Sequence, residues 1–152
     1  MALDATHRDA AMAELDRLMQ RHPGFQVAAL ALRDGRPFVQ RHRGDVDANK
    51  LAAMSSALVA LGSTVLAELA AGTLDHVLVD GQHGKLVLVR LPERAGLVIL
   101  ALLANAEALP GLVLGQARTC AVAVGGILMR ASLSIDRTGP AASAPAGLSA
   151  AV

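Results

Sequence analysis

The stretch KLAAMSSALVALGSTVLAELAAG, residues 50–72, decides the fold. It has no charged residue from Leu51 to Ala67 and is nearly long enough to cross a membrane, which takes about 20 apolar residues. Its high alanine content and its Ser, Thr and Gly residues favour instead a helix that is buried on more than one side of a globular domain. We therefore expect a long helix here and no membrane span.

Two stripes run along this predicted helix. The large side chains recur at helical spacing and are expected to pack on a sheet: Leu51, Met54, Leu58, Leu61, Val65 and Leu69. The other stripe is smaller and more polar, and charges occur only near the ends, at Lys50 and Glu68. A water-facing helix side normally carries charges, and an uncovered one would leave an apolar patch. We therefore expect a second subunit, rather than the other two helices, to cover the small stripe, with a dimer interface that includes Ala52, Ser55, Ser56, Val59, Gly62, Ser63 and Leu66.

The flanking segments predict an α+β domain. Asp45 or Asp47 can cap the long helix and Gly72 can end it. The periodicity predicts helices at 5–21 and from 110 or 111 to 129, a hairpin at 25–44 with its turn at Asp34-Gly35, and three further strands within 73–93 and 95–105, with turns at 81–84 and 92–96. Sequential strands joined by short turns favour a five-stranded antiparallel sheet, in the order α-β-β-α-β-β-β-α, with helices on its faces. We expect one domain over 1–136 and a disordered Pro/Ala-rich tail over 137–152.

Composition excludes several classes of function. The formal net charge is +1 and the only aromatic residues are Phe25 and Phe38, whereas nucleic-acid modules usually show a basic excess and stacking aromatics. The single cysteine, Cys120, cannot form an internal disulfide, and the N-terminus lacks the apolar core of a signal peptide. These features predict a cytoplasmic protein that does not bind nucleic acid.

No residue pattern indicates catalysis. Cys120 lies in a predicted helix without an identifiable partner that would activate its thiol, so a buried structural role is favoured. His76 and His83 flank Asp80 and could form a weak metal site, but ordinary surface histidines are favoured. We predict no catalytic residue, no cofactor and no metal site.

The densest basic region surrounds the second hairpin strand. Arg36, Arg41 and Arg43 could contact an acidic partner surface. The favoured interpretation is a solvated strand edge, since Pro and Arg on an edge prevent unwanted pairing.

The order and spacing of these segments resemble the Roadblock domain, the dynein-light-chain-related family whose order is also profilin-like. The resemblance covers about residues 8–130, and its strongest parts are VAALALRDGRPFV (27–39) and DVDANKLAAMSSALVALGSTVLAELAAG (45–72). The matching three-strand run is LDHVLVDGQHGKLVLVRLPERAGLVILALLA (74–104), and the last helix matches at GLVLGQARTCAVAVGGIL (111–128). The family's turn often carries Ser before Asp-Gly, where this chain has Arg33.

The resemblance implies a homodimer that pairs through the central helix, Lys50–Ala71, and the following strand, Leu74–Val79, so that two sheets join. It thereby adds His76 and Leu78 to the expected interface. It also implies a non-enzymatic scaffold or regulator of a small Ras-like GTPase, acting as an activator or effector, without a catalytic residue to transfer. The alternative is a small-ligand sensor that holds a metabolite against the sheet in an aliphatic pocket.

Overall fold

The described residues form three helices and five strands in the predicted order. The computed structural model describes residues 5–92 and 97–137. Its elements are α1 (Ala5–Arg21), β1 (Phe25–Leu32), β2 (Pro37–His42), α2 (Ala48–Glu68), β3 (His76–Gly81), β4 (Gly84–Arg90), β5 (Val98–Asn105) and α3 (Pro110–Arg137). The predicted α+β fold is confirmed. The last helix ends at Arg137 rather than 129, the predicted turn at 92–96 lies mostly outside the described residues, and so does the predicted tail beyond Arg137.

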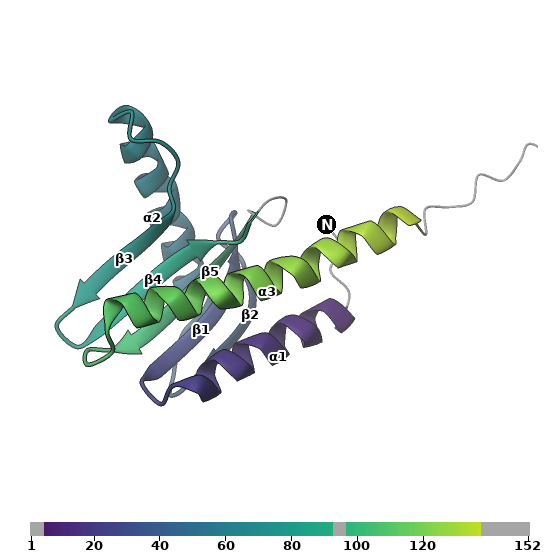
Figure 1. Ribbon diagram of the computed structural model, residues 1–152, viewed down its shortest axis with the longest axis horizontal. Helices are drawn as coiled ribbons and strands as arrows, with labels where there is room; N and C mark the ends of the chain where they lie inside the picture. The colour runs from purple at the N-terminus through teal and green to yellow at the C-terminus, as the bar shows by residue number, and fades with distance from the viewer. Residues whose placement is uncertain (1–4, 93–96, 138–152) are drawn as a thin grey trace, which may run out of the picture.

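The sheet is antiparallel throughout, with the strand order β2-β1-β5-β4-β3. The turn between β1 and β2 lies at Asp34-Gly35, as predicted, and Gly35 has a φ of 89°, a conformation that favours glycine. The strands β3, β4 and β5 follow one another as a meander. Because β2 and β3 lie at opposite edges, α2 crosses the sheet between them (Figure 1).

The main core lies between one face of the sheet and the helices α1 and α3, which lie side by side in front of it (Figure 1). It is built almost entirely from aliphatic side chains, with Phe25 and Leu100 fully buried at its centre. Arg43 fastens the end of α1 to the sheet, because its guanidinium donates to the carbonyls of Pro23 at 2.6 Å and Met19 at 2.9 Å. This face of the sheet is therefore covered by the chain itself.

Of the three described helices, only α2 packs on the opposite face, over a smaller cluster. Asp47 caps the helix by accepting hydrogen bonds from the backbone N–H groups of Asn49 and Lys50. The helix ends at Glu68, and Ala70 and Gly72 then adopt positive φ values of 51° and 89°. Only three residues of this helix are buried: Ala52, Ser55 and Val59.

The predicted orientation of α2 is wrong. The small stripe faces the sheet, where Val59 belongs to one buried cluster with five residues of the strands: Val27, Ala29, Leu88, Ile99 and Ala101. Of the large stripe, Leu51 and Leu58 pack partly against this cluster, whereas Met54, Leu61, Val65 and Leu69 are exposed. The physical reason is that small residues allow the helix to approach the sheet closely, which leaves the bulky side chains on the outside.

Two described helices, Ala48–Glu68 and Pro110–Ala131, are long and apolar enough to cross a membrane by length and composition alone. Core helices of soluble proteins meet the same criterion, so this is weak evidence. The helix α3 packs its buried side over the main core, with Val113, Ala117, Val124 and Leu128 completely or almost completely buried. The outer face of α2, in contrast, is exposed.

Candidate interface along α2 and β3

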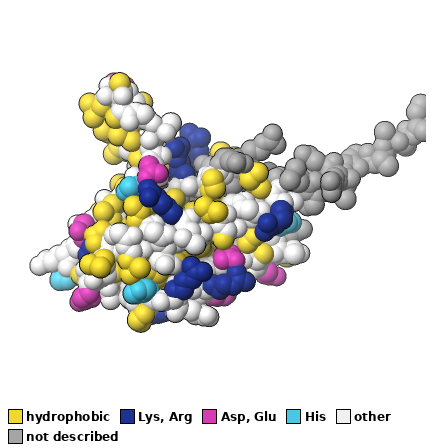
Figure 2. Space-filling model, viewed as in Figure 1, with side chains coloured by type: hydrophobic (Ala, Val, Ile, Leu, Met, Phe, Trp, Pro, Cys, Tyr) yellow, Lys and Arg dark blue, Asp and Glu magenta, His cyan; other side chains and the backbone are white. Residues whose placement is uncertain are grey.

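The outer face of α2 is the largest concentration of exposed apolar side chains among the described residues. Leu61 is 62% exposed and Leu69 is 71% exposed, and both follow Met54 at helical spacing with Val65 between them. The C-terminal end of α2 projects beyond the sheet (Figure 1), and hydrophobic side chains gather on this end (Figure 2). Monomeric soluble proteins seldom expose a contiguous apolar surface of this kind, so it is a candidate interaction surface.

The strand β3 forms the edge of the sheet next to α2. It pairs only with β4 among the described strands, and its Leu78 and Val79 side chains are exposed. Its sequence, HVLVDG, contains no Pro, Lys or Arg to discourage pairing with another strand. The opposite edge, β2, has the sequence PFVQRH and carries Pro37 and Arg41. The two edges therefore differ in kind, and β3 is the one that is open to pairing.

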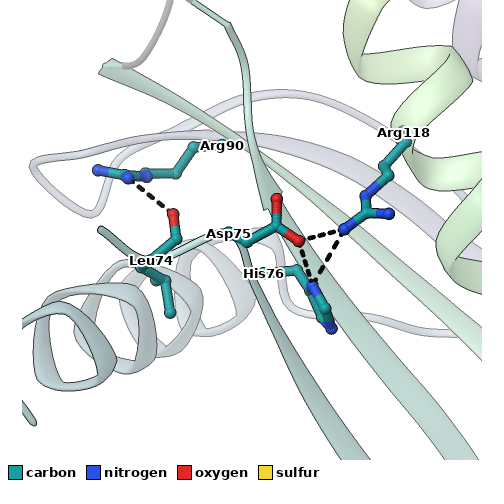
Figure 3. A network of polar contacts seen from close by, with 5 residues as sticks. All are labelled: Leu74, Asp75, His76, Arg90 and Arg118. Atoms are coloured by element: carbon teal, nitrogen blue, oxygen red, sulfur yellow. Dashed lines mark hydrogen bonds and ion pairs between the residues drawn. The ribbon is translucent and has the colours of Figure 1, made fainter. Parts of the chain in front are cut away.

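A polar network fixes the start of β3. Arg118 of α3 forms an ion pair with Asp75, and His76 Nδ1 lies 2.9 Å from an Asp75 carboxylate oxygen (Figure 3). The hydrogen bond with His76 and the nearby charge of Arg118 lower the pKa of the Asp75 carboxyl. On the other side of the chain, Arg90 donates to the Leu74 carbonyl at 2.8 Å (Figure 3). The strand that borders the exposed face of α2 is thus tied to both α3 and β4.

The predicted interface residues fall into two groups. Ala52, Ser55 and Val59 are buried against the chain's own sheet, so their assignment to a dimer interface is wrong. The physical reason is the reversed orientation of α2, since close packing on the sheet requires small side chains. The sequence analysis expected Met54, Leu61, Val65 and Leu69 to pack on the sheet, so it did not name these exposed residues as candidates for an interface.

The other predicted positions on α2 are half-buried. The Ser56 hydroxyl donates to the Arg33 carbonyl, and Ser63 lines a cavity between α2 and the sheet. A Cβ built at Gly62 would lie 3.4 Å from the Leu74 side chain of the same chain, and Leu66 is also half-buried. On β3, His76 is half-buried and Leu78 is exposed at the sheet edge. A role of these six positions in a dimer stays a prediction.

The three arginines predicted as partner contacts have partners within the chain. Arg36 pairs with Asp34 at 2.7 Å and Arg41 pairs with Asp16 at 2.5 Å, while Arg43 fastens the end of α1 as described above. All three are exposed and lie on or near β2. The edge position of β2 confirms the favoured interpretation of a solvated strand edge, and contact with an acidic partner stays a prediction.

The described residues offer little for catalysis. No group of three or more His, Cys, Asp or Glu side chains within them could hold a metal ion. Cys120 is almost fully buried, and this burial raises the pKa of its thiol to about 11, which opposes formation of the nucleophilic thiolate. An aliphatic cavity of about 200 Å³ lies beside α2, lined by Val27, Val46, Leu51, Leu86, Ala101 and Leu103.

Comparisons with known proteins agree with this architecture. The family model of the Roadblock/LC7 domain matches residues 12–101. Two uncharacterized proteins of Methanocaldococcus jannaschii, MJ0310 and MJ1340, are each 32% identical over 90 residues, which is 59% of this chain and 75% of theirs.

Solved structures share the fold at low sequence identity. The Roadblock/LC7 domain from Streptomyces avermitilis is 24% identical with a TM-score of 0.69, over 77% of this chain and 96% of that one. A structure of MglB with tetrameric arrangement is 18% identical with a TM-score of 0.76, and gliding protein MglB from Thermus thermophilus is 16% identical with a TM-score of 0.75. Both MglB matches cover 86% of this chain and 96% of the other chain.

Proposed function

Because this chain belongs to the Roadblock/LC7 domain family, we propose that it is a homodimeric scaffold that regulates a small Ras-like GTPase. The family supports a regulatory role in a GTPase pathway, and the described residues offer a binding surface in place of catalytic groups. Such a regulator would act beside its GTPase in the cytoplasm. The observation that carries the proposal is the uncovered apolar face of α2 next to the open edge of β3.

In the proposed dimer, two β3 strands pair along their free edges and the outer faces of two α2 helices pack together. Leu78 is 42% exposed at that edge, and the exposed large side chains of α2 lie beside it on the same side of the molecule. A two-fold axis through this surface would bring each patch onto its own copy, the usual geometry of homodimers. The solved MglB with tetrameric arrangement, which shares the fold, also self-associates.

The proposed mechanism depends on binding alone. A dimer that binds one nucleotide state of the GTPase more tightly than the other shifts the population toward that state by the difference in binding free energy. If hydrolysis is accelerated, the dimer would do so by positioning the GTPase's own residues. The chain's arginines near β2 are held by partners within the chain, so none is nominated as a catalytic finger.

The test is size-exclusion chromatography with light scattering, with and without a Ras-like GTPase from the same organism, loaded with GDP or with a non-hydrolysable GTP analogue. The expected result is a mass of twice 15.6 kDa for the protein alone and co-elution with one loaded form in preference to the other. Equal absence of binding in both states would count against the GTPase role. A mass of 15.6 kDa at all concentrations would count against the dimer.

The alternative function, a sensor for a small apolar metabolite, has one observation in its favour. The aliphatic cavity beside α2 lies against the sheet and is lined by hydrophobic side chains alone. Its volume of about 200 Å³ suits a ligand below drug size. Short-chain aliphatic metabolites would raise the melting temperature if they bind there, and a flat response would leave this alternative without support.

A further inference from the structure

We propose that a second cavity, on the flank of α2, binds a small phosphate-bearing ligand through two arginines. This flank cavity has a volume of about 210 Å³ and lies between α2 and the sheet. Its polar lining comes from Arg33, Arg90, Ser56, Ser63 and Thr64, and Ile99 forms part of its floor. The proposal is independent of dimer formation and of any GTPase.

The strand order brings the two arginines together. Ile99 of β5 is paired with Ala31 of β1 on one side and with Arg90 of β4 on the other. Arg33 follows the end of β1, two residues beyond Ala31, and lines the cavity together with Arg90. Arg33 and Arg90 therefore flank Ile99 from the two neighbouring strands, on the face that α2 covers.

The side of α2 that lines the cavity consists mostly of small residues, and three of them carry hydroxyl groups: Ser56, Ser63 and Thr64. The Ser56 hydroxyl donates to the Arg33 carbonyl, which fixes the helix against the end of β1. The Thr64 hydroxyl donates to the Ala60 carbonyl at 3.0 Å, and its oxygen can still accept a hydrogen bond. The Ser63 hydroxyl has no hydrogen bond to another described residue, so it can donate to a ligand oxygen.

The charge of the cavity is uncompensated among the described residues. None of the described residues in its lining is acidic. Arg90 is anchored by one N–H to the Leu74 carbonyl, which leaves other N–H groups of its guanidinium available, and the Arg33 guanidinium has no hydrogen bond or ion pair with a described residue. Two cations at one cavity repel each other, and an oxyanion between them would remove that repulsion while accepting forked guanidinium hydrogen bonds.

Size and polarity define the ligand class. Drug-sized ligands occupy cavities of roughly 300–1,000 Å³, so about 210 Å³ accommodates a phosphate group with a short carbon body rather than a nucleotide. Val59 and Ile99 supply apolar surface for that body. No residue of β3 lines the cavity, and the neighbouring Gly62 of α2 faces Leu74 and Val77 instead. Binding would therefore remain possible when the β3 edge is paired.

The test is isothermal titration calorimetry of the full chain with inorganic phosphate at constant ionic strength, together with amide chemical-shift mapping by NMR. The expected result is saturable binding, with shifts centred on Arg33, Arg90 and residues 56–64. Arg33→Gln should raise the Kd by about tenfold or more, because it removes charge-assisted hydrogen bonds. Arg36→Gln is the matched control, since Arg36 lies in the same hairpin but pairs only with Asp34, and its Kd should stay unchanged.

Two further arms separate binding from folding and define the ligand. Ser63→Leu should fill the cavity and abolish phosphate binding while the melting temperature is kept. Glycerol 3-phosphate should bind at least as well as inorganic phosphate, and GTP should bind no better than phosphate. Absence of saturable binding up to about 10 mM phosphate, well above an ordinary millimolar Kd, would overturn the proposal. So would an equal Kd for Arg33→Gln, Ser63→Leu and the unmodified chain.

Discussion

At the scale of single residues, two neighbouring serines of α2 differ in whether their hydroxyl groups are hydrogen-bonded. Ser55 is fully buried, and its hydroxyl oxygen has no hydrogen-bond partner among the described residues. Ser56 is half-buried, and its hydroxyl donates to the Arg33 carbonyl. A buried hydroxyl without a partner destabilises the folded state by its lost hydration, whereas a paired one stabilises it.

Ser55→Ala should therefore raise the free energy of unfolding, and Ser56→Ala should not. Both substitutions share the same gain in helix propensity, so the difference between them isolates the hydroxyls and should be about 1 kcal/mol or more in favour of Ser55→Ala. Urea unfolding followed by circular dichroism measures it. Equal stabilities of the two variants would show that Ser55 has a partner that pairs its hydroxyl in solution.

Cys120 should be chemically inert in the folded protein. Its pKa is raised from 9.0 to about 11, chiefly by burial, so the thiol stays protonated at neutral pH. Because the folded pKa is the higher one, the neutral thiol contributes stability below pH 9, which is lost as the pH rises toward 11. Ellman's reagent at pH 8 should react slowly with the native chain and fast in urea. A native rate equal to that of free cysteine would contradict this burial.

At the scale of elements, turn and cap chemistry could be predicted from the sequence, but the orientation of α2 could not. Asp34-Gly35 marks the observed turn, because a left-handed glycine is needed there. The helix α2 is apolar on nearly all sides, so its periodicity contains two candidate buried stripes and nothing local to choose between them. The choice depends on the sheet surface beneath, where Ala29 and Ala101 allow close approach only to a small-residue stripe.

For the N-terminal cap of α2, the sequence left two candidates, Asp45 and Asp47. The structure selects Asp47, which accepts hydrogen bonds from two backbone N–H groups. Asp47→Ala should lower the free energy of unfolding by about 1 kcal/mol, the usual cost of losing such a cap. Asp45→Ala is the control: Asp45 is exposed, and its loss should change stability by less than about 0.5 kcal/mol. Urea midpoints that fall equally in both variants would contradict the assignment.

At the scale of the whole molecule, the sites depend on strand order. The sequence predicted five antiparallel strands but not which of them are neighbours, and the flank cavity exists because β5 lies between β1 and β4. Arg33 and Arg90 are far apart in the chain, and no local pattern links them. The same limit applies to the edges: β2 could be predicted as an edge from its Pro and Arg content, whereas only the family resemblance implied that β3 is an edge, and the observed strand order shows it.

Dimer formation should make thermal stability depend on concentration. The melting temperature should rise by several degrees over about a hundredfold increase in concentration, because association stabilises only the folded chain. Leu61→Lys should abolish this dependence by placing a charge in the proposed interface. Leu109→Lys is the control: Leu109 is 71% exposed but belongs to neither α2 nor β3, so the dependence should persist. A melting temperature independent of concentration in the unmodified chain would exclude a coupled dimer.

The unequal edges of the sheet also limit how large an assembly can grow. A sheet with two open edges can add copies without end and form a fibril. Here Pro37 and Arg41 lie on one edge, and of the described strands only β3 forms an edge without such residues. Once two β3 strands have paired, a β2 strand lies at each outer edge of the joined sheet. Pro37 and Arg41 of that strand oppose the addition of a further strand. In the proposed dimer, an exposed apolar edge strand therefore pairs once and does not become a seed for polymerisation.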